Sequence, residues 1–446
     1  MKSNDNRYDP VFPESGDYLG GLMQARLPAE AMHVLEAVAG CSSRTGIPAY
    51  IVGGPVRDLL LSRPVVDIDV VVEGDGPGFA AELATDNEGK LVEYARFGTA
   101  LVVLPGGIKV DVTTAREESY IKPGALPDVE PGTLDKDLFR RDFTINAMAI
   151  QLGPERFGYF IDLYGGTSDL AKGIIRVLHE GSFRDDPTRI LRAIRFETRY
   201  GFAIEEGTVS RLVESVEEGM LAEVSAQRLS QEIVAILKEE GAAAAVEHLN
   251  RTGVLRALFG DLFIYRDSVD NLLEKACSGA DWYLEMAKKS PLTKLTKWRL
   301  RWLIVMGETA PEVAIALGNK FHLGRLVAKA ADEVRGRLPA IREYLSGEQD
   351  EAASFVYRLM EDLSPEVLLY AVVLAGRENV LEIIEHYLLE IRPIKAFVNG
   401  NDLKEIGVAE GPLMGEILEL LLDKQLDGVI SSRSNAMKEA RILVHM

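Results

Sequence analysis

The sequence predicts an α+β domain followed by a succession of helices. Short β-branched and apolar runs alternate with helical segments up to about residue 178, and from Glu206 onward nearly every segment has the apolar spacing of a helix. A chain of 446 residues is too long for one ordinary hydrophobic core, so we expect about two to four domains. The mixed domain should come first, with all-helical domains after it.

The composition limits the class of protein. With 47% hydrophobic and 27% charged residues, the chain reads as soluble and globular. Its apolar runs are too short to span a membrane and the N-terminus lacks an apolar signal core, so we expect a cytoplasmic protein without a membrane partner. Cys41 and Cys277 have no CxxC or Cys/His spacing, which argues against a disulfide framework or a zinc site. A net charge of −19 argues against indiscriminate polyanion binding, so a nucleic-acid site would have to be local.

The first motif is a Gly-Gly pair at the end of a short apolar run. Ala49–Val52 has the composition of a strand, and Gly53 and Gly54 follow it. Glycines after a strand let backbone N–H groups approach and hold an anionic phosphate. The pair is a candidate phosphate site, although a Gly-Gly pair alone is usually only a turn.

The second motif is a pair of carboxylates in a β-branched run. Asp67 and Asp69 are two residues apart, so on a strand both point to one face, while Ile68 and Val70 point to the other. Two carboxylates on a rigid element suit Mg²⁺, which takes one or two carboxylates together with substrate phosphate oxygens. Asp-x-Asp alone is usually a solvated face, but the two motifs together, a short helix apart, are far more specific.

Asp111 is the candidate third carboxylate. In the predicted strand 108–112, Val110 and Val112 share one face, and Asp111 lies on the other. Three acidic groups from neighbouring strands can hold two cations roughly 3.5–4 Å apart, which activates an attacking oxygen and neutralises a leaving pyrophosphate. The alternative is an ordinary half-exposed strand residue.

The segments around these motifs have weaker signals. Leu27–Cys41 and Phe79–Glu88 have helical spacing, and Ile161–Val177 resembles a turn that returns the chain to a last strand. Thr113–Asp137 is long, rich in Pro, Gly and charge, and has no clear period. A loop of that length inside a compact domain is usually functional.

A polar cluster follows this loop. The adjacent Arg140 and Arg141 can clamp a triphosphate. Asp142 and Asn146 are four residues apart, so on a helix they share a face from which they can hydrogen-bond ribose hydroxyls. The alternative is a surface Arg-Asp pair that contributes little.

Asp186 and Arg189 are candidate base-reading residues. Pro187 suits the first position of a helix, which makes Asp186 the N-cap and places Arg189 at nearly the same edge. A carboxylate accepts from the amino group of C or A, and a guanidinium donates to the neighbouring ring nitrogen or carbonyl, whereas U and G present the opposite pattern. The alternative is that Asp186 only caps the helix and Arg189 is solvated.

Two later segments carry further charged candidates. Arg228 and Glu232 are placed for an i,i+4 pair that braces the preceding helix. The most basic segment surrounds Trp298 and Trp302 and is a candidate RNA-backbone patch, although an amphipathic helix with snorkelling cations explains it equally well. Its cations are Lys288, Lys289, Lys294, Lys297, Arg299 and Arg301.

Together, these motifs resemble those of class II tRNA nucleotidyltransferases, the superfamily of CCA-adding enzymes and bacterial poly(A) polymerases. The resemblance covers about residues 48–237, and the terminal Gly-Asn-Asp-Leu and Gly-Pro segments are similar to tails of CCA-adding and A-adding members. It implies a flexible arm at 1–24, a polymerase-β-like nucleotidyltransferase head at 25–178, and an all-helical neck, body and tail at 179–260, 261–392 and 393–446.

The resemblance also implies roles for single residues. The matches of Asp67 and Asp69 bind metal ions in that family, and the matches of Asp186 and Arg189 pair with the incoming base. One departure is Asp185, where the family usually has Glu. The matches of Arg140, Arg141, Asp142 and Asn146 hold the triphosphate and ribose. The whole expected nucleotide-binding set comprises Gly53, Gly54, Arg57, Arg140, Arg141, Asp142, Asn146, Asp186, Arg189 and Arg192.

The expected activity is template-independent addition of CCA, or of its terminal A, to the 3′ end of tRNA. The terminal hydroxyl attacks the α-phosphorus of CTP or ATP in line, helped by two Mg²⁺, and pyrophosphate leaves. Thr113–Asp137 resembles the loop that helps family members accommodate ATP, so we expect A to be added. The alternatives are a poly(A) polymerase acting on general RNA 3′ ends and a catalytically idle RNA-binding protein, and an incorporation assay discriminates them.

Overall fold

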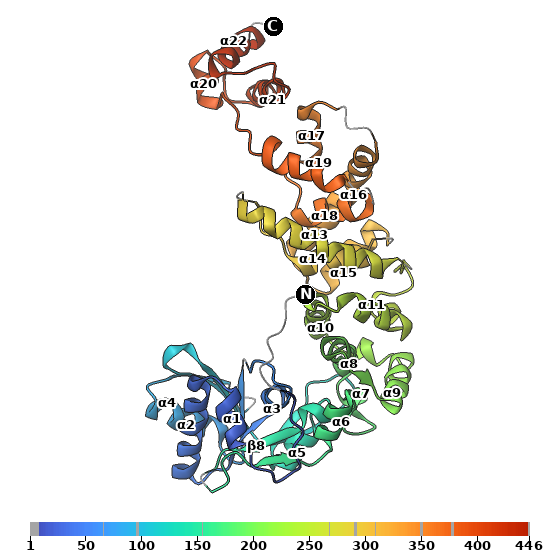
Figure 1. Ribbon diagram of the computed structural model, residues 1–446. Coiled ribbons are helices and arrows are strands. Elements are labelled where there is room, and N and C mark those ends of the chain that lie inside the picture. Colours follow the sequence, from blue (N-terminus) through green and yellow to red (C-terminus); the bar gives the residue numbers. More distant parts are fainter. Residues whose placement is uncertain are drawn as a thin grey trace. The chain divides into compact units, whose positions relative to one another are not determined.

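The chain forms two compact units in a computed structural model (Figure 1). The first unit comprises Met1–Glu232 and His248–Leu258, and the second comprises Ile233–Glu247 and Phe259–Met446. The division into head, neck, body and tail therefore stays a prediction. The structure describes residues 9–65, 67–94, 98–153, 155–266, 268–289, 292–307, 309–347, 351–375 and 379–444.

A seven-stranded mixed sheet organises the first unit, with the strand order β3-β4-β5-β2-β1-β8-β9. Neighbouring strands are antiparallel except β2 and β5, which run parallel. The predicted strands around both carboxylate motifs are thus confirmed, except that β2 begins at Ile68 and Asp67 lies just before it. The bounds are β1 Ala49–Val52, β2 Ile68–Val72, β3 Lys90–Tyr94, β4 Thr99–Val103, β5 Lys109–Thr114, β8 Met148–Gln151 and β9 Phe160–Asp162.

The helices that cover this sheet follow the predicted apolar spacing. α2 (Ala29–Thr45) contacts β1 and α4 (Gly76–Asp86), and α4 contacts four strands, β2 to β5. The helix expected from Phe79 begins at Gly76, because the Asp75 side chain accepts a hydrogen bond from the Gly78 N–H at 3.1 Å and caps the first turn. Two shorter helices, α1 (Gly20–Arg26) and α3 (Gly54–Leu60), belong to the same unit.

The predicted long loop Thr113–Asp137 is wrong in part. β6 (Arg116–Ser119) and β7 (Asp128–Pro131) form an antiparallel hairpin, and α5 (Leu134–Phe139) follows it. The strands of this hairpin carry mainly charged residues and bury little, so they have no apolar alternation from which a strand could be predicted.

The predicted last strand of this region is present at Ile174–Ile175, but it belongs to a different sheet. α6 (Gly166–Lys172) leads into β10 (Ile174–Ile175), which does not join the large sheet. Instead, β10 pairs in parallel with β11 (Ala203–Ile204) in a separate two-stranded sheet. The prediction considered only local pattern, and this partner lies almost thirty residues further along the chain.

Helices make up nearly all of the chain after β10, as the sequence predicts (Figure 1). No helix in the described ranges is long and apolar enough to cross a membrane. The helices between β10 and α13 are α7 Ser182–Asp185, α8 Thr188–Tyr200, α9 Glu206–Glu217, α10 Ala226–Lys238, α11 Ala242–Arg251 and α12 Val254–Phe259.

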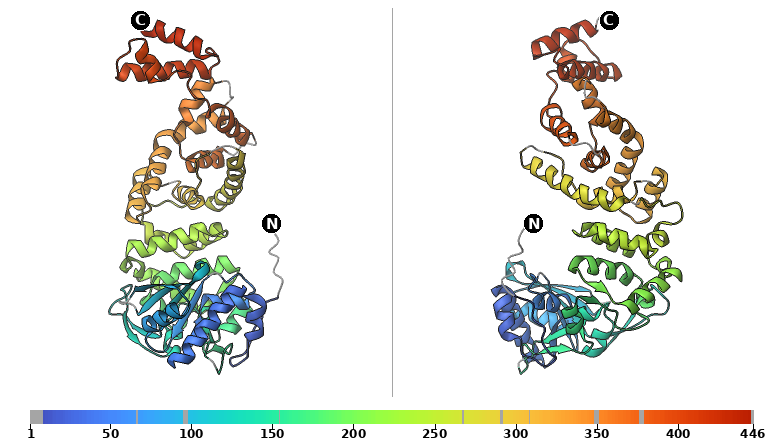
Figure 2. Two further views of the ribbon diagram at one scale, coloured as in Figure 1. Left: turned by 90° about the vertical axis from the view of Figure 1, so that its left-hand side faces the viewer. Right: turned by 45° about the vertical axis from the view of Figure 1, so that its right-hand side comes forward.

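The second unit packs around α18 (Pro365–Ala375), which is almost entirely buried and contacts α13, α14 and α16. The last three helices, red in Figure 2, have a separate apolar cluster that includes Leu403, Ile417 and Leu421. The helices are α13 Val269–Lys289, α14 Lys297–Val305, α15 Pro311–Lys320, α16 Arg325–Ser346, α17 Ala353–Met360, α18, α19 Val380–His386, α20 Gly400–Glu405, α21 Pro412–Leu426 and α22 Arg433–Val444.

Candidate active site

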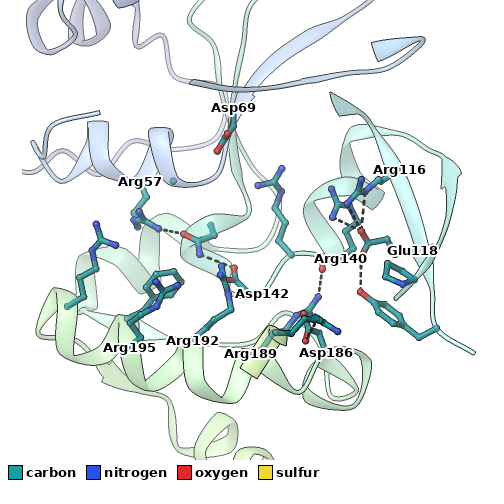
Figure 3. Close-up of a pocket in the computed structure, with 18 residues that line it drawn as sticks. Arg57, Asp69, Arg116, Glu118, Arg140, Asp142, Asp186, Arg189, Arg192 and Arg195 are labelled. Carbon is teal, nitrogen blue, oxygen red and sulfur yellow. Dashed lines mark hydrogen bonds and ion pairs between the residues drawn. The ribbon is translucent and has the colours of Figure 1, made fainter. Parts of the chain in front are cut away.

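A cavity of about 570 Å³ in the first unit brings together most of the predicted site residues (Figure 3). The sheet and α3 contribute one part of its lining, the segment 140–146 another, and α8 a third. Nine arginines and four carboxylates line the cavity, so it attracts a polyanion although the chain as a whole is acidic. The predicted residues in the lining are Gly54, Arg57, Asp69, Arg140, Arg141, Asp142, Asn146, Asp186, Arg189 and Arg192.

Asp69 and Asp111 are direct neighbours across the parallel strands β2 and β5. Side chains in register on neighbouring strands share a face, so the two carboxylates lie side by side. Burial raises the pKa of Asp69, as do Asp111 and Asp67, while Arg141 lowers it. Burial and Asp67 likewise raise the pKa of Asp111. The three predicted carboxylates are therefore close enough to repel one another.

These carboxylates fit an open metal site but not a closed cage. Within the described ranges, no three His, Cys, Asp or Glu side chains converge closely enough to hold a metal ion by themselves. Mg²⁺ is commonly held by one or two carboxylates, with substrate phosphate oxygens and water completing its shell. The repulsion between Asp69 and Asp111 fits that arrangement, because a cation would relieve it.

Gly53 is favoured by its backbone conformation, and the end of the Arg141 side chain lies close to it. Its φ of 74° lies in the left-handed region, and a Cβ atom there would be 2.6 Å from Nη1 of Arg141. The Gly53 N–H donates to the carbonyl of Met148 at 3.0 Å. This N–H is therefore already paired, but Gly54 lines the cavity, so the phosphate role of the glycine pair stays a prediction.

The two adjacent arginines are held by a buried carboxylate. Asp137 accepts hydrogen bonds from Arg140 Nη2 at 2.6 Å and from Arg141 Nη2 at 2.9 Å. Burial alone would raise the pKa of Asp137, but the two guanidiniums hold it below its ordinary value. Arg140 also donates to Glu118 at 2.9 Å. Both cations are thus positioned before any ligand binds.

The side chains of Asp142 and Asn146 lie next to each other as predicted, but the helix predicted to carry them is absent. A 3₁₀ turn, Thr144–Asn146, replaces it, because the backbone before the turn pairs elsewhere: Phe143 forms an antiparallel bridge with Val177, and the Thr144 N–H donates to the carbonyl of Arg176 at 2.9 Å. The Asn146 Nδ2 still donates to Asp142 Oδ1 at 2.8 Å. Arg192 donates to Asp142 Oδ2 through Nε at 3.0 Å and Nη2 at 2.5 Å.

Asp142 is expected to make stability depend on acid pH. Burial would raise its pKa, but Arg192 and Asn146 outweigh burial and lower it to about 2. A depressed pKa contributes stability that is complete above about pH 4 and is lost as the pH falls toward 2, worth about 2 kcal/mol. Between pH 5 and pH 3, the free energy of unfolding should therefore fall less in Asp142→Asn than in the wild type. Chemical unfolding at pH 5, 4 and 3 measures this. An unchanged slope, or the same change in the exposed Asp128→Asn, would contradict this.

Asp186 and Arg189 line the cavity from the start of α8. The helix begins at Thr188 with Pro187 as the N-cap, so the prediction of Asp186 as the N-cap is off by one residue. The Asp186 carboxylate nevertheless accepts from the Thr188 N–H at 3.0 Å and forms an ion pair with Arg228 at 2.8 Å. Arg189 is only 5% exposed, which excludes the solvated alternative. It donates to Ser182 Oγ at 2.6 Å and to the carbonyl of Arg140 at 2.5 Å.

Arg228 and Glu232 brace α8 as predicted, but not through a pair with each other. Arg228 binds Asp186 and the carbonyl of Gly124, whereas Glu232 forms ion pairs with Arg192 at 3.4 Å and Arg195 at 3.3 Å. The i,i+4 rule describes pairs within one helix, whereas here both side chains pair with charged residues in or just before α8.

Several residues that line the cavity were not predicted from the sequence. Arg195 lies three residues after Arg192, and Arg199 lies four residues after Arg195, so the helical periodicity of α8 could have predicted both. Glu118 and Tyr120 could not be found, because the β6–β7 hairpin was not recognised. The missed lining residues are Arg116, Glu118, Tyr120, Pro127, Arg195, Phe196, Arg199 and Arg228.

The predicted basic patch in the second unit is only partly compatible with RNA binding. Arg301 is 5% exposed and donates to the carbonyls of Leu237 at 2.8 Å and Glu239 at 2.5 Å, so its assignment as an RNA contact is wrong. Lys294 is exposed. Lys288 pairs with Glu285, Lys297 with Asp281 and Arg299 with Glu366, while the side chain of Lys289 lies outside the described part of the structure.

Arg301→Met is expected to destabilise the protein and leave RNA binding unaffected. The substitution leaves two buried carbonyl groups without their hydrogen-bond donor, which should lower the free energy of unfolding by about 2–4 kcal/mol. The matched variant Lys294→Met should change it by less than about 0.5 kcal/mol, because Lys294 is exposed. Thermal unfolding and tRNA binding of the two variants test this. Unchanged stability in Arg301→Met would refute the structural role.

The mixed sheet, its carboxylates and the arginine-lined cavity define a nucleotidyltransferase of the polymerase-β type. Residues 49–176 match the poly A polymerase head domain, and residues 201–263 match a family described as a probable RNA and SrmB-binding site of polymerase A. A structure of a CCA-adding enzyme in its apo form superposes with a TM-score of 0.84 at 35% identity over 97% of this chain and 100% of that one. The chain belongs to the class II tRNA nucleotidyltransferase family.

Other relatives carry related names. A Thermotoga maritima CCA-adding enzyme complexed with tRNA has a TM-score of 0.80 at 34% identity, with 97% of this chain and 100% of that chain covered. An A-adding tRNA nucleotidyltransferase of Geobacter sulfurreducens is 35% identical over 94% of this chain. The chain spans only 48% of that relative, but 95% of the A-adding enzyme of Halalkalibacterium halodurans, to which it is 29% identical over 95% of its own length.

Proposed function

We propose that this protein adds nucleotides to the 3′ end of tRNA from CTP and ATP, without a template and with release of pyrophosphate. One observation carries the proposal: a single cavity joins Asp69, the arginine cluster around Asp142, and the pair Asp186 and Arg189. The similar structures include CCA-adding enzymes in complexes with ATP, with CTP and with tRNA, which supports the same ligands for this chain. We also propose that the protein acts in the cytoplasm, as the sequence analysis expects.

The residues of the cavity divide the work of binding the nucleotide. Arg140 and Arg141, fixed by Asp137, bind the triphosphate. Asp142 and Asn146 accept and donate hydrogen bonds at the ribose, with Arg57 and Arg192 holding them in place. Asp186 and Arg189 present the acceptor and donor that match the Watson–Crick edges of C and A. The incoming nucleotide is thereby oriented with its α-phosphate toward the strand that carries Asp69.

The carboxylates Asp67 and Asp69 would hold Mg²⁺, with Asp111 beside them. When bound, the cations supply charge neutralisation at the reacting phosphate and at the leaving pyrophosphate. Asp111 lies in register with Asp69 and can accept the proton of the terminal 3′ hydroxyl or orient that hydroxyl. The hydroxyl oxygen bonds to the α-phosphorus as the bond to the pyrophosphate oxygen breaks.

The helical remainder would hold the RNA. We propose that residues 179–260 form a neck that reads the base, that 261–392 form a body and that 393–446 form a tail that binds tRNA. Lys288, Lys289, Lys294 and Lys297 remain candidates for backbone contacts. A protein with net charge −19 needs such local patches, because it has little general attraction for RNA.

The added nucleotides can be determined with a set of primers. Purified protein should be given tRNAs that end before CCA, after C and after CC, with CTP and ATP separately and together. We expect A to be added to the CC-ended tRNA. Extension of that tRNA alone marks an A-adding enzyme, and extension of all three marks a CCA-adding enzyme. Absence of any extension would overturn the proposal.

A further inference from the structure

A second cavity, of about 470 Å³, adjoins the nucleotide cavity in the first unit. Arg140, Arg189 and Glu118 line both cavities and so form a wall between them. The wall is fixed, because Arg140 pairs with Glu118 at 2.9 Å and its carbonyl accepts from Arg189 at 2.5 Å. Nothing in the proposed reaction uses the space behind this wall.

An aromatic surface forms one side of the second cavity. Phe139, the last residue of α5, is 44% exposed, although large aromatic side chains such as phenylalanine are usually buried. Its ring stacks on His179, with centroids 5.0 Å apart and planes 28° apart, and lies 5.7 Å from Tyr164. Burial and the charge of Arg189 outweigh Asp185 and keep the pKa of His179 below its ordinary value, so the imidazole is uncharged at neutral pH. This surface suits a flat, uncharged ring.

The charges around the second cavity balance one another, unlike those of the first. Four carboxylates and three Lys or Arg cations line it, against four carboxylates and nine arginines in the nucleotide cavity. Lys136 pairs with Glu117, Arg140 with Glu118, and His179 lies 3.7 Å from Asp185. A phosphate gains little in such surroundings. A base with an exocyclic amino group gains more, because carboxylates are hydrogen-bond acceptors.

We propose that this second cavity binds one unpaired nucleobase of the RNA substrate, stacked on Phe139 with its amino group toward the carboxylates at the rim. Single-stranded RNA ends are recognised in this manner, by stacking on aromatic side chains and by hydrogen bonds to the base edges. The inference rests on the proposed function, because it supplies that reaction with a contact for its RNA substrate. It places RNA recognition in the same unit as nucleotide binding, on the opposite side of Arg189.

The cavity can be tested with 2-aminopurine, whose fluorescence falls when it stacks. A tRNA that ends after CC should carry this base at each unpaired acceptor position in turn and be titrated with protein without nucleotide. We expect quenching at one position with the wild type and with Phe139→Tyr, and loss of quenching with Phe139→Leu. The KM for tRNA should rise about tenfold in Phe139→Leu, while the KM for ATP stays unchanged.

Tyr94→Leu is the matched control, because Tyr94 is 51% exposed on β3 and lies outside both cavities. Equal quenching in Phe139→Leu and the wild type would overturn the inference, as would an equal loss in Tyr94→Leu. A parallel rise of the KM for ATP would also overturn it, since the effect would then be a general distortion. Incorporation by the wild type is measured separately, so a failure of the proposed function is distinguished from a failure of this site.

Discussion

Asp69→Asn is expected to lower the rate of nucleotide incorporation by about a hundred- to a thousandfold, the size of effect seen when one group that stabilises transition-state charge is lost. Asparagine keeps the shape of the side chain but removes the charge that would hold a cation at the reacting phosphate. Asp69 lines the nucleotide cavity and lies beside Asp111. Asp67→Asn should act in the same direction. Single-turnover incorporation of labelled nucleotide into tRNA measures the loss.

The matched control for this variant is Glu93→Gln, which also removes one negative charge from the same sheet. Glu93 is exposed on β3 and lies outside both cavities, so the Glu93→Gln variant should incorporate nucleotides at the wild-type rate. The affinity for tRNA should be nearly the same in both variants, because the loss concerns chemistry rather than RNA binding. If Asp69→Asn retained even a tenth of the wild-type rate, the metal assignment would be wrong.

Asp186→Asn is expected to reduce the preference for C and A over U and G. The carboxylate can only accept hydrogen bonds, whereas an amide can turn and donate to the carbonyl of U or G. Hydrogen-bond readout of one base pair edge is worth about 1–3 kcal/mol, so the preference should fall by about 5- to 150-fold. The amide oxygen can still accept from Thr188, which preserves the start of α8. Competition between ATP and UTP or GTP in single-turnover reactions measures the change.

Glu180→Gln provides the control for the base-reading prediction. Its carboxylate is 89% exposed, pairs with Arg211 and lies outside the nucleotide cavity. The same neutral substitution there should leave the nucleotide preference unchanged. A folded Asp186→Asn protein that still rejects UTP and GTP as the wild type does would rule out the reading role. Its folding can be checked by thermal unfolding beside the control.

The parts of the fold that follow local pattern could be predicted from the sequence. In β2, Asp69 alternates with the buried Ile68 and Val70. This alternation predicted both the strand and the face of it on which the carboxylate lies. The same reasoning placed Asp111 on the accessible face of β5, but it could not show that the two residues are in register. Register between β2 and β5 depends on strands about forty residues apart.

The parts that depend on charged contacts could not be predicted. The β6–β7 hairpin has hardly any apolar alternation, so Glu118 and its bonds to Arg116 and Arg140 had no visible signal. Arg301 was misassigned for a related reason. A cation beside Trp302 looks the same in sequence whether it faces RNA or caps buried carbonyls, and only tertiary packing decides between them.

The most direct test of the central claim compares a tRNA that ends after CC, which both a CCA-adding and an A-adding enzyme would extend, with an unstructured oligonucleotide of equal length. Wild-type protein with Mg²⁺, labelled CTP and labelled ATP should extend the tRNA far faster, release one pyrophosphate for each nucleotide added, and stop when the CCA end is complete. A tRNA that stays unlabelled, or long A tails on the oligonucleotide, would contradict the account, and the second result would identify a poly(A) polymerase instead.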